Sequence, residues 1–363
     1  MARYRSARDI DWTLAALALL LCGLGVLQIF SATHESVFSS AWWKQILWVG
    51  LGLVAMWIFA SVDYHHLLER VPLLYVLSLA TLVAVLLVGA QIFGSRRWIP
   101  IYGGLRLQVS EFVKLVIILL VARCLAEFRR DRIELRDLIR LVGLVALPMA
   151  LVIKQPDLGT SLTYAAILLT GLFLAGLSWR YWLAGGVLAV VLLPAVWTHL
   201  REYQKERINA FVNPGRDPRG AGYQVIQSKI AIGSGGLWGQ GTTQGSQTQL
   251  RFLPVPHTDF IFSAFGEEHG FVGVVVALGL YFLVLMQIVH NAQTAPDRAG
   301  MYVCMCVAGL MLFQVFVNVG MVVGRMPVTG LPLPFMSYGG SNTISVFAML
   351  GLVNSVRLQR FGN

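Results

Sequence analysis

Long apolar runs alternate with short polar segments along most of the chain. Each run is about 20 residues long, the length that an α-helix needs to cross the hydrocarbon core of a bilayer. We therefore expect an all-α, polytopic membrane protein with about ten transmembrane helices. The predicted spans are residues 11–32, 42–61, 71–93, 109–126, 138–153, 159–177, 181–198, 259–290, 300–323 and 338–358.

One polar segment, residues 199–258, is much longer than the others and separates the seventh predicted span from the eighth. We interpret residues 1–363 as a single transmembrane domain that contains this loop. Most Lys and Arg residues of the short loops fall in alternate loops and in the two terminal segments, and such basic segments stay on the cytoplasmic side. The pattern predicts an N-in, C-in orientation, with the 199–258 loop outside.

Composition supports this class of protein. Hydrophobic residues make up 56% of the chain and charged residues only 13%, whereas about 25% of the residues in soluble domains are charged. The formal net charge of +10 is therefore interpreted by the sidedness of the loops rather than as a sign of nucleic-acid binding. The four cysteines lie in or beside apolar runs, without disulfide or zinc spacing, which favours small core residues.

The long loop has two parts. The first, HLREYQKERINAFVNPGRDPRGAGYQVIQSKIAIGSGG, alternates charged and apolar residues, as an amphipathic helix on a surface does. The second, GLWGQGTTQGSQTQLRFLP, is rich in Gly, Gln and Thr but lacks the Gly-Lys-Ser/Thr ending of a nucleotide-binding loop. It is either a flexible linker or a loop whose backbone closely approaches a polar ligand.

Polar residues interrupt or border the apolar runs at four places, all in the predicted outer half of the bundle. A charged side chain at membrane depth is costly unless it is solvated, paired or used in function. Convergence of the four clusters in one water-accessible cavity is a hypothesis. The clusters are Glu111 with Lys114, the KQPDLGTS segment with Lys154, Gln155 and Asp157, the residues His257, Thr258 and Asp259, and Arg325 before a Pro- and Gly-rich segment.

Structural explanations compete with functional ones at each cluster. Asp259 stands where it would cap the eighth span, and either Asp157 or Thr160 would similarly cap the sixth. Glu111 and Lys114 are three residues apart on one helix face and would form a stabilising pair. The Pro- and Gly-rich segment after Arg325 predicts a broken or re-entrant stretch, which is tolerated only against protein or water.

Arginines in the short outer loops are a further signal, because basic residues usually avoid that face. Arg96, Arg97 and Arg325 lie beside Pro or Gly in turn-rich segments. They either extend toward lipid headgroups or form an anion site, since the guanidinium fork binds phosphate oxygens bidentately.

Four motifs resemble the signatures of the SEDS family (shape, elongation, division and sporulation), in particular its RodA type. They are KQPDLGTS, GSGGLWGQGTTQGSQTQLRFLP, LPVPHTDFIFSAFGEEHGFVG and PVTGLPLPFMSYGGSN, and the resemblance extends from the first span to the last. Two positions depart from the family pattern. Val255 stands where an acidic Glu is common, which weakens a role for an acid just upstream of Asp259, and Val109 stands where Pro is common.

The resemblance implies a ten-helix enzyme that polymerises lipid II into the β-1,4 glycan strands of peptidoglycan, for cell elongation and shape. The reaction would invert the donor sugar at the outer face of the bacterial cytoplasmic (inner) membrane. A class B penicillin-binding protein would be the membrane partner that supplies the transpeptidase. Asp259 falls on the family's catalytic aspartate, whereas Glu111 and Lys114 match its polar fourth helix and Lys154, Gln155 and Asp157 its QPD segment.

This chemistry assigns roles to the clusters. A sugar hydroxyl is a poor nucleophile, so Asp259 would act as the base that removes its proton, with His257 or Thr258 orienting the carboxylate or the hydroxyl. The leaving pyrophosphate develops negative charge and requires cations. The candidates are Arg96, Arg97, Lys114 and Lys154. A divalent cation such as Mg or Mn would be able to share this work, although no liganding pattern requires one.

Two other functions are compatible with the same residues. A flippase for the lipid-linked precursor would use the same outer cavity, but it also needs a polar route through the inner half, which looks almost uniformly apolar. A non-catalytic scaffold would use the polar residues only for stability. Within the family, the short N-terminal arm favours the elongation type over the division type.

Overall fold

Helices account for all ten predicted spans. The computed structural model describes residues 10–34, 36, 38–92, 95–100, 106–128, 133–217 and 220–360. Apolar segments form helices because only a helix satisfies all of its own backbone groups without water. The helices are α1 (Trp12–Thr33), α2 (Ala41–Ser61), α3 (Tyr64–Glu69), α4 (Val71–Val88), α5 (Val109–Glu127), α6 (Leu135–Lys154), α7 (Leu158–Leu174), α8 (Trp179–His199), α9 (Glu202–Val212), α10 (Ala221–Ser234), α11 (Ser246–Gln249), α12 (Ile261–Gln293), α13 (Arg298–Val322) and α14 (Gly340–Gln359).

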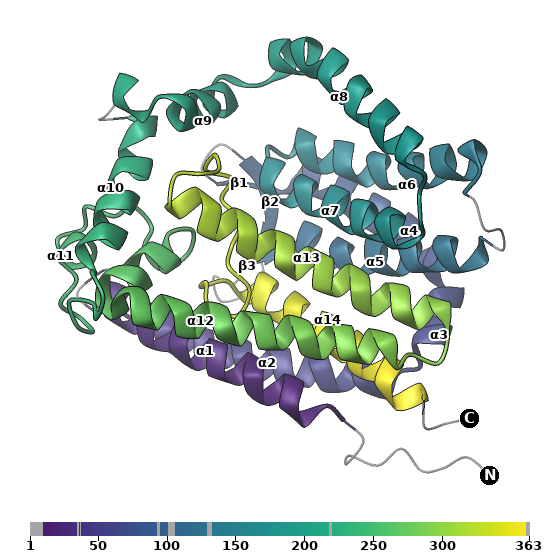
Figure 1. Ribbon diagram of the computed structural model, residues 1–363, viewed down its shortest axis with the longest axis horizontal. Helices are drawn as coiled ribbons and strands as arrows, with labels where there is room; N and C mark the ends of the chain where they lie inside the picture. Colours follow the sequence, from purple (N-terminus) through teal and green to yellow (C-terminus); the bar gives the residue numbers. More distant parts are fainter. Residues whose placement is uncertain are drawn as a thin grey trace.

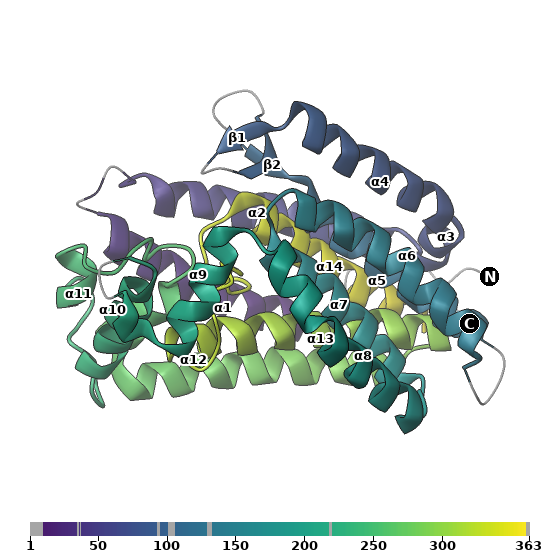
Figure 2. The same cartoon turned by 90° about the horizontal axis from the view of Figure 1, so that it is seen from above.

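Most of the long helices lie side by side with their axes roughly aligned (Figures 1 and 2). By length and apolar composition, α1, α2, α4, α12 and α13 are able to cross a membrane in the described part of the chain. Helices α5 and α14 form the centre, where α14 packs along α2 and α5 packs against α13, α7 and α4. The long loop contains α9, α10 and α11, so the predicted amphipathic part is helical but divided.

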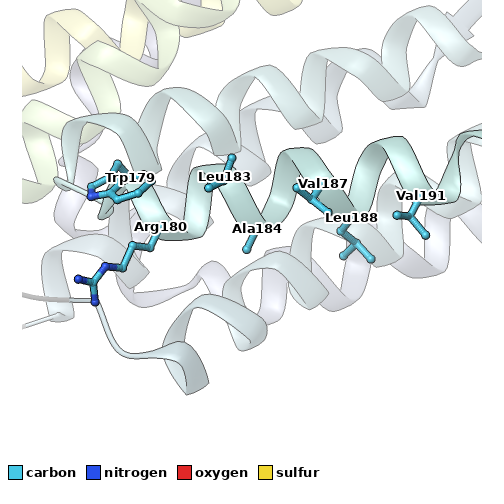
Figure 3. Close-up of a pocket in the computed structure, with 7 residues that line it drawn as sticks. All are labelled: Trp179, Arg180, Leu183, Ala184, Val187, Leu188 and Val191. Atoms are coloured by element: carbon cyan, nitrogen blue, oxygen red, sulfur yellow. The ribbon is translucent and has the colours of Figure 1, made fainter.

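Helix α8 is exposed along almost its whole length. It runs along one edge of the bundle between α7 and α9 (Figures 1 and 2). Leu183, Val187 and Leu188 are among the side chains that line a shallow apolar hollow of about 470 Å³, whose lining comes entirely from α8 (Figure 3). Such an apolar surface would be a liability in water, so we infer that α8 faces lipid.

A small antiparallel sheet was not predicted. The third predicted span was drawn to residue 93, but α4 ends at Val88 and is followed by strands β1 (Ala90–Ile92), β2 (Ser95–Pro100) and β3 (Arg106–Gln108), in the order β1-β2-β3. Trp98 pairs with Gln108, whose backbone N–H donates to Ser341 Oγ of α14 at 2.9 Å. The sheet therefore rests on the central helix and places β2 at the end of the bundle where α5 begins.

Helix α12 is interrupted at Gly270, which has φ +65° and ψ −166°. The backbone of the Gly-rich loop fills the interruption. Gln240 N donates to Glu267 O at 3.0 Å, and Val272 N donates to Leu237 O at 3.1 Å. The close approach that the glycines predict is thus made to α12. The interruption leaves these backbone groups satisfied, as burial requires.

Replacing Gly270 with Ala is expected to destabilise the protein strongly. Only glycine adopts this backbone conformation readily, and other residues lose about 1–3 kcal/mol there. An added Cβ would also lie 2.3 Å from Gly239 N and 2.7 Å from Leu237 O. Thermal unfolding in detergent measures the loss. Gly279→Ala is the control on the same helix, because its Cβ would meet nothing within 4 Å; equal unfolding temperatures for the two variants would contradict this account.

A buried acidic residue joins three helices at the other end of the bundle. Asp11 is 1% exposed and caps α1 through its contact with Leu14 N. Its Oδ2 lies 2.9 Å from Arg357 Nη1 of α14 and accepts from Asn291 Nδ2 of α12 at 2.7 Å. Its backbone N–H donates to Asn354 Oδ1 at 2.8 Å. The first helix is therefore fixed to α12 and α14 by one carboxylate.

Candidate active site

Asp259 lies in the turn that precedes α12 and is half-buried. The capping explanation for this residue is wrong, because the residue before α12 is Phe260 and no side chain caps this helix. Asn318 Nδ2 of α13 donates to the Asp259 backbone oxygen at 3.1 Å. Among the described residues, no side chain or backbone group forms a hydrogen bond or ion pair with the carboxylate. Asp259 is therefore held by its backbone while its carboxylate stays available.

Arg207 of α9 faces the same space as Asp259. A Cβ built on Gly330 would lie 3.6 Å from Asp259 Oδ2 and 3.8 Å from Arg207 Nη1, so the two charged groups meet over this glycine. Arg207 Nη1 donates to Val328 O at 3.2 Å, and its guanidinium lies 5.9 Å from the ring of Tyr203. Sequence reasoning missed Arg207. The only local signal is its spacing of four residues from Tyr203, which places the two on one helix face.

A second charged group approaches from β2 and α7. Arg97 Nη1 lies 3.4 Å from Asp157 Oδ1, and Arg97 Nε is buried without a hydrogen-bond partner. Of the two candidates for the cap, Asp157 and Thr160, Asp157 caps α7 by accepting from Thr160 N. Its Oδ2 also accepts from Gln108 Nε2 at 2.7 Å. The QPD segment and the sheet therefore hold Arg97 beside Asp157.

Burial and these charges together set the basicity of Asp259. Burial raises the pKa of the Asp259 carboxyl, Arg207 and Arg97 lower it, and Asp157 raises it again, so the pKa lies above its ordinary value. A carboxylate with a raised pKa is a stronger base when ionised. The surroundings of Asp259 therefore favour removal of a proton from a weakly acidic group such as a hydroxyl.

His257 and Thr258 are held by the segment between α13 and α14. This segment has no helix over residues 323–339, as the Pro and Gly content predicts, and Phe335 and Met336 within it are buried. Tyr338 N donates to His257 O at 2.9 Å, and Ser337 Oγ donates to Thr258 O at 2.7 Å. These contacts fix the backbone that leads into Asp259.

The His257 ring itself lies between two aromatic side chains. Its centroid is 5.1 Å from that of Phe38 and 5.9 Å from that of Tyr338. Burial lowers the pKa of His257, so the neutral imidazole predominates at neutral pH. A neutral ring can orient a neighbouring group without adding positive charge beside Asp259.

Glu111 and Lys114 form the predicted pair inside α5. Lys114 Nζ lies 2.6 Å from Glu111 Oε2, and the two residues are 0% and 2% exposed. Ser345 Oγ of α14 also donates to Glu111 Oε2, at 3.3 Å. The Lys114 ammonium is therefore matched by a carboxylate within the protein.

No hydrogen bond or ion pair joins Asp259 to those remaining predicted site residues whose side chains the structure describes. Gln155 is buried and its Nε2 donates to Leu82 O of α4 at 2.9 Å. Lys154 and Arg325 are exposed. The Arg96 side chain lies outside the part of the chain that the structure describes. Within that part, no group of three or more His, Cys, Asp or Glu side chains is arranged to hold a metal ion.

Comparisons with known proteins cover almost the entire chain. The family model described as "Cell cycle protein", which covers FtsW, RodA and SpoVE, matches residues 11–361. Peptidoglycan glycosyltransferase MrdB of Escherichia coli K12 is 41% identical over 360 residues, covering 97% of this chain and 94% of the relative. Stage V sporulation protein E of Bacillus subtilis is 34% identical over 368 residues, covering 97% and 98%.

Solved structures agree with these matches. A chain from a peptidoglycan synthase complex, described as coordinating polymerization and crosslinking, superposes with a TM-score of 0.83 at 38% identity, covering 98% of this chain and 99% of that one. The rod shape determining protein RodA of Thermus thermophilus superposes with a TM-score of 0.72 at 32% identity, covering 98% of each chain. The chain therefore belongs to the FtsW/RodA/SpoVE family of cell cycle proteins.

Proposed function

We propose that this protein is a peptidoglycan glycosyltransferase that polymerises lipid II into β-1,4 glycan strands, for cell elongation and shape. Two relatives named as peptidoglycan glycosyltransferases support this activity, because they are 41% and 32% identical to this chain over nearly its full length. The observation that carries the proposed mechanism is the available carboxylate of Asp259, which faces Arg207 across Gly330. A base and a cation at one place are what a glycosyl transfer with a diphosphate leaving group requires.

In the proposed reaction, Asp259 accepts the proton of the GlcNAc 4-hydroxyl on one lipid II molecule. The hydroxyl oxygen then attacks C1 of the donor MurNAc, and the C1–oxygen bond to the undecaprenyl diphosphate breaks. Attack opposite to the leaving group converts an α-linked donor into a β-1,4 product. Arg207 and Arg97 stabilise the charge that develops on the diphosphate, because one guanidinium group binds two phosphate oxygens at once.

We further propose the N-in, C-in orientation, with a single transmembrane domain over residues 1–363 and the 199–258 loop outside the bacterial cytoplasmic membrane. The basic residues of the predicted inner loops support it. Asp259 then opens to the outer face, where the glycan product is needed. A class B penicillin-binding protein is proposed as the transpeptidase partner, since the related solved structure is a complex that coordinates polymerization with crosslinking.

Polymerisation of lipid II by the purified full-length protein, with and without the transpeptidase partner, tests the proposed activity. Glycan strands that lysozyme digests are the expected product. Translocation of lipid II across vesicle membranes without polymer would contradict the enzyme and favour a flippase. Absence of both activities from folded protein would favour a scaffold.

Arg207→Met is expected to lower kcat/KM for lipid II by about 10²-fold, within the range seen when one charge-stabilising donor is removed. It should also shift the acid limb of the pH profile to higher pH, because Arg207 lowers the pKa of Asp259. Initial rates at several pH values measure both effects. Lys205→Met is the control on the same helix, since Lys205 pairs only with exposed Glu202 among the described residues. An unshifted pH profile in Arg207→Met would remove Arg207 from the site.

A further inference from the structure

A second hollow lies between the start of α4, the end of α5 and the start of α6, and its volume is about 290 Å³. The Asp259 cluster lies near the start of α5, whereas this hollow lies near its end. The α5 residues that line the hollow, Leu120 to Glu127, follow the first residue of α5, Val109, by 11 to 18 residues. At a rise of about 1.5 Å per residue, the two sites are separated by roughly 17–27 Å along α5. The hollow is therefore distinct from the proposed active site.

One of the two arginines that line the hollow is already bound by the protein. Arg123 Nε lies 2.9 Å from Glu127 Oε1, and its Nη1 donates to Leu68 O at 2.8 Å and to Glu69 O at 3.1 Å. These carbonyls end α3, where a cation is favourable. Arg123 thus lines the hollow, but most of its N–H donors already bind protein groups.

The other charged pair in the lining has no such partners. Asp137 and Arg140 lie one turn apart on α6, and neither forms a hydrogen bond or an ion pair with any residue that the structure describes. Arg140 therefore offers a free cation to the hollow, and Asp137 a free anion.

The rest of the lining is apolar and opens to the lipid-facing surface. Val76 of α4 lines the hollow and is 61% exposed. Leu141 and Leu144 of α6 continue the apolar wall, and Tyr75 Oη closes it by donating to Leu144 O at 2.7 Å. A ligand with an apolar chain would enter from the bilayer and place its polar end beside Asp137 and Arg140.

We propose that this hollow binds one glycerophospholipid with a zwitterionic aminoethyl phosphate headgroup. The lipid phosphate contacts Arg140, the ammonium contacts Asp137, and an acyl chain lies along Val76 and Leu144. A phospholipid with an anionic headgroup satisfies Arg140 but leaves Asp137 without a cation. The lining therefore selects for a headgroup that carries both charges.

Thermal unfolding of the full-length protein in detergent, titrated with defined lipids, tests the proposal, because a ligand of the folded state raises Tm in a saturable way. Phosphatidylethanolamine is expected to raise Tm at lower concentrations than phosphatidylglycerol, and soluble phosphoethanolamine or inorganic phosphate to have no effect. Equal or tighter binding of phosphatidylglycerol would overturn the zwitterionic assignment. An effect of the soluble headgroup or of phosphate at the same concentrations would overturn the lipid assignment.

Substitutions of Asp137 and Arg140 test which part of the lipid headgroup each residue binds. Asp137→Asn is expected to weaken phosphatidylethanolamine binding about tenfold and leave phosphatidylglycerol binding unchanged or tighter, whereas Arg140→Gln weakens both about tenfold. Arg136→Ala is the control on α6, since Arg136 is exposed and does not line the hollow. Parental binding of phosphatidylethanolamine by Asp137→Asn or Arg140→Gln would overturn the site. Tm without lipid shows that each variant is folded.

Discussion

Asp259→Asn should reduce the initial rate of lipid II polymerisation by about 10²- to 10⁴-fold, the contribution that a positioned base makes to proton transfer. The amide keeps the shape of the side chain but cannot accept the proton of the sugar hydroxyl. The assay uses purified full-length protein with its transpeptidase partner. Glu202→Gln on α9 is the control, because this carboxylate is exposed and pairs only with Lys205 among the described residues.

The Tm of Asp259→Asn shows whether a loss of activity comes from loss of the base or from unfolding of the protein. The pKa of Asp259 is raised in the folded state by burial, so its contribution to stability is fully present below the unfolded pKa and is lost as pH rises through the folded pKa. At neutral pH the folded protein thus bears the cost of an ionised, half-buried carboxylate. Asp259→Asn removes that charge, so its Tm at neutral pH should equal or exceed that of the parent. A folded variant that polymerises at the parental rate would exclude Asp259 as the base.

The parent enzyme should also lose activity as pH falls through the raised pKa of Asp259, because the protonated carboxyl is no longer a base. The same rate measurements, repeated from neutral to acidic pH, locate this acid limb of the pH–rate profile. Residual activity of Asp259→Asn should lack it.

The largest expected loss of stability follows Lys114→Met. This change leaves the Glu111 carboxylate buried, with the Ser345 hydroxyl, at 3.3 Å, as its remaining hydrogen-bond partner among the described residues. Breaking a buried ion pair from one side costs about 3–5 kcal/mol in the free energy of unfolding. Thermal unfolding in detergent should show this as a large drop in Tm. The double variant Glu111→Gln with Lys114→Met should recover much of the loss, since it leaves no unpaired charge.

Lys154→Met is the matched control for Lys114, because Lys154 is an exposed lysine at the end of α6. It should unfold at the parental temperature. If Lys114→Met instead keeps the parental Tm but raises the lipid II concentration needed for half-maximal rate, Lys114 contacts the substrate rather than serving stability.

Apolar run length was sufficient to predict the helices, because a membrane leaves the backbone few other structures. It could not predict the sheet at residues 90–108, whose strands are three to six residues long and gain stability from contacts with α14. The sequence likewise could not predict that Arg207 lies beside Asp259. Its role depends on the approach of α9 to Gly330, which is more than 120 residues away in the sequence. The local sequence around Arg207 predicts only a charged helix.

Single residues of the site differed in how far sequence could place them. Asp157 and the Glu111–Lys114 pair follow from local rules of capping and helical spacing. The approach of Arg97 to Asp157 depends on the unpredicted sheet. Gln155 was grouped with Asp157 by position, yet the end of α6 turns its side chain toward α4, because neighbouring residues in a turn point in different directions.

The Asp11 contacts constrain how the chain is assembled during synthesis. Asp11 belongs to the first helix, but its partners Asn354 and Arg357 belong to the last. Until α14 has been made and inserted, this carboxylate lacks its cation and must remain near water. The contacts that Asp11 makes with α14 therefore form only after α14 has been inserted beside α1.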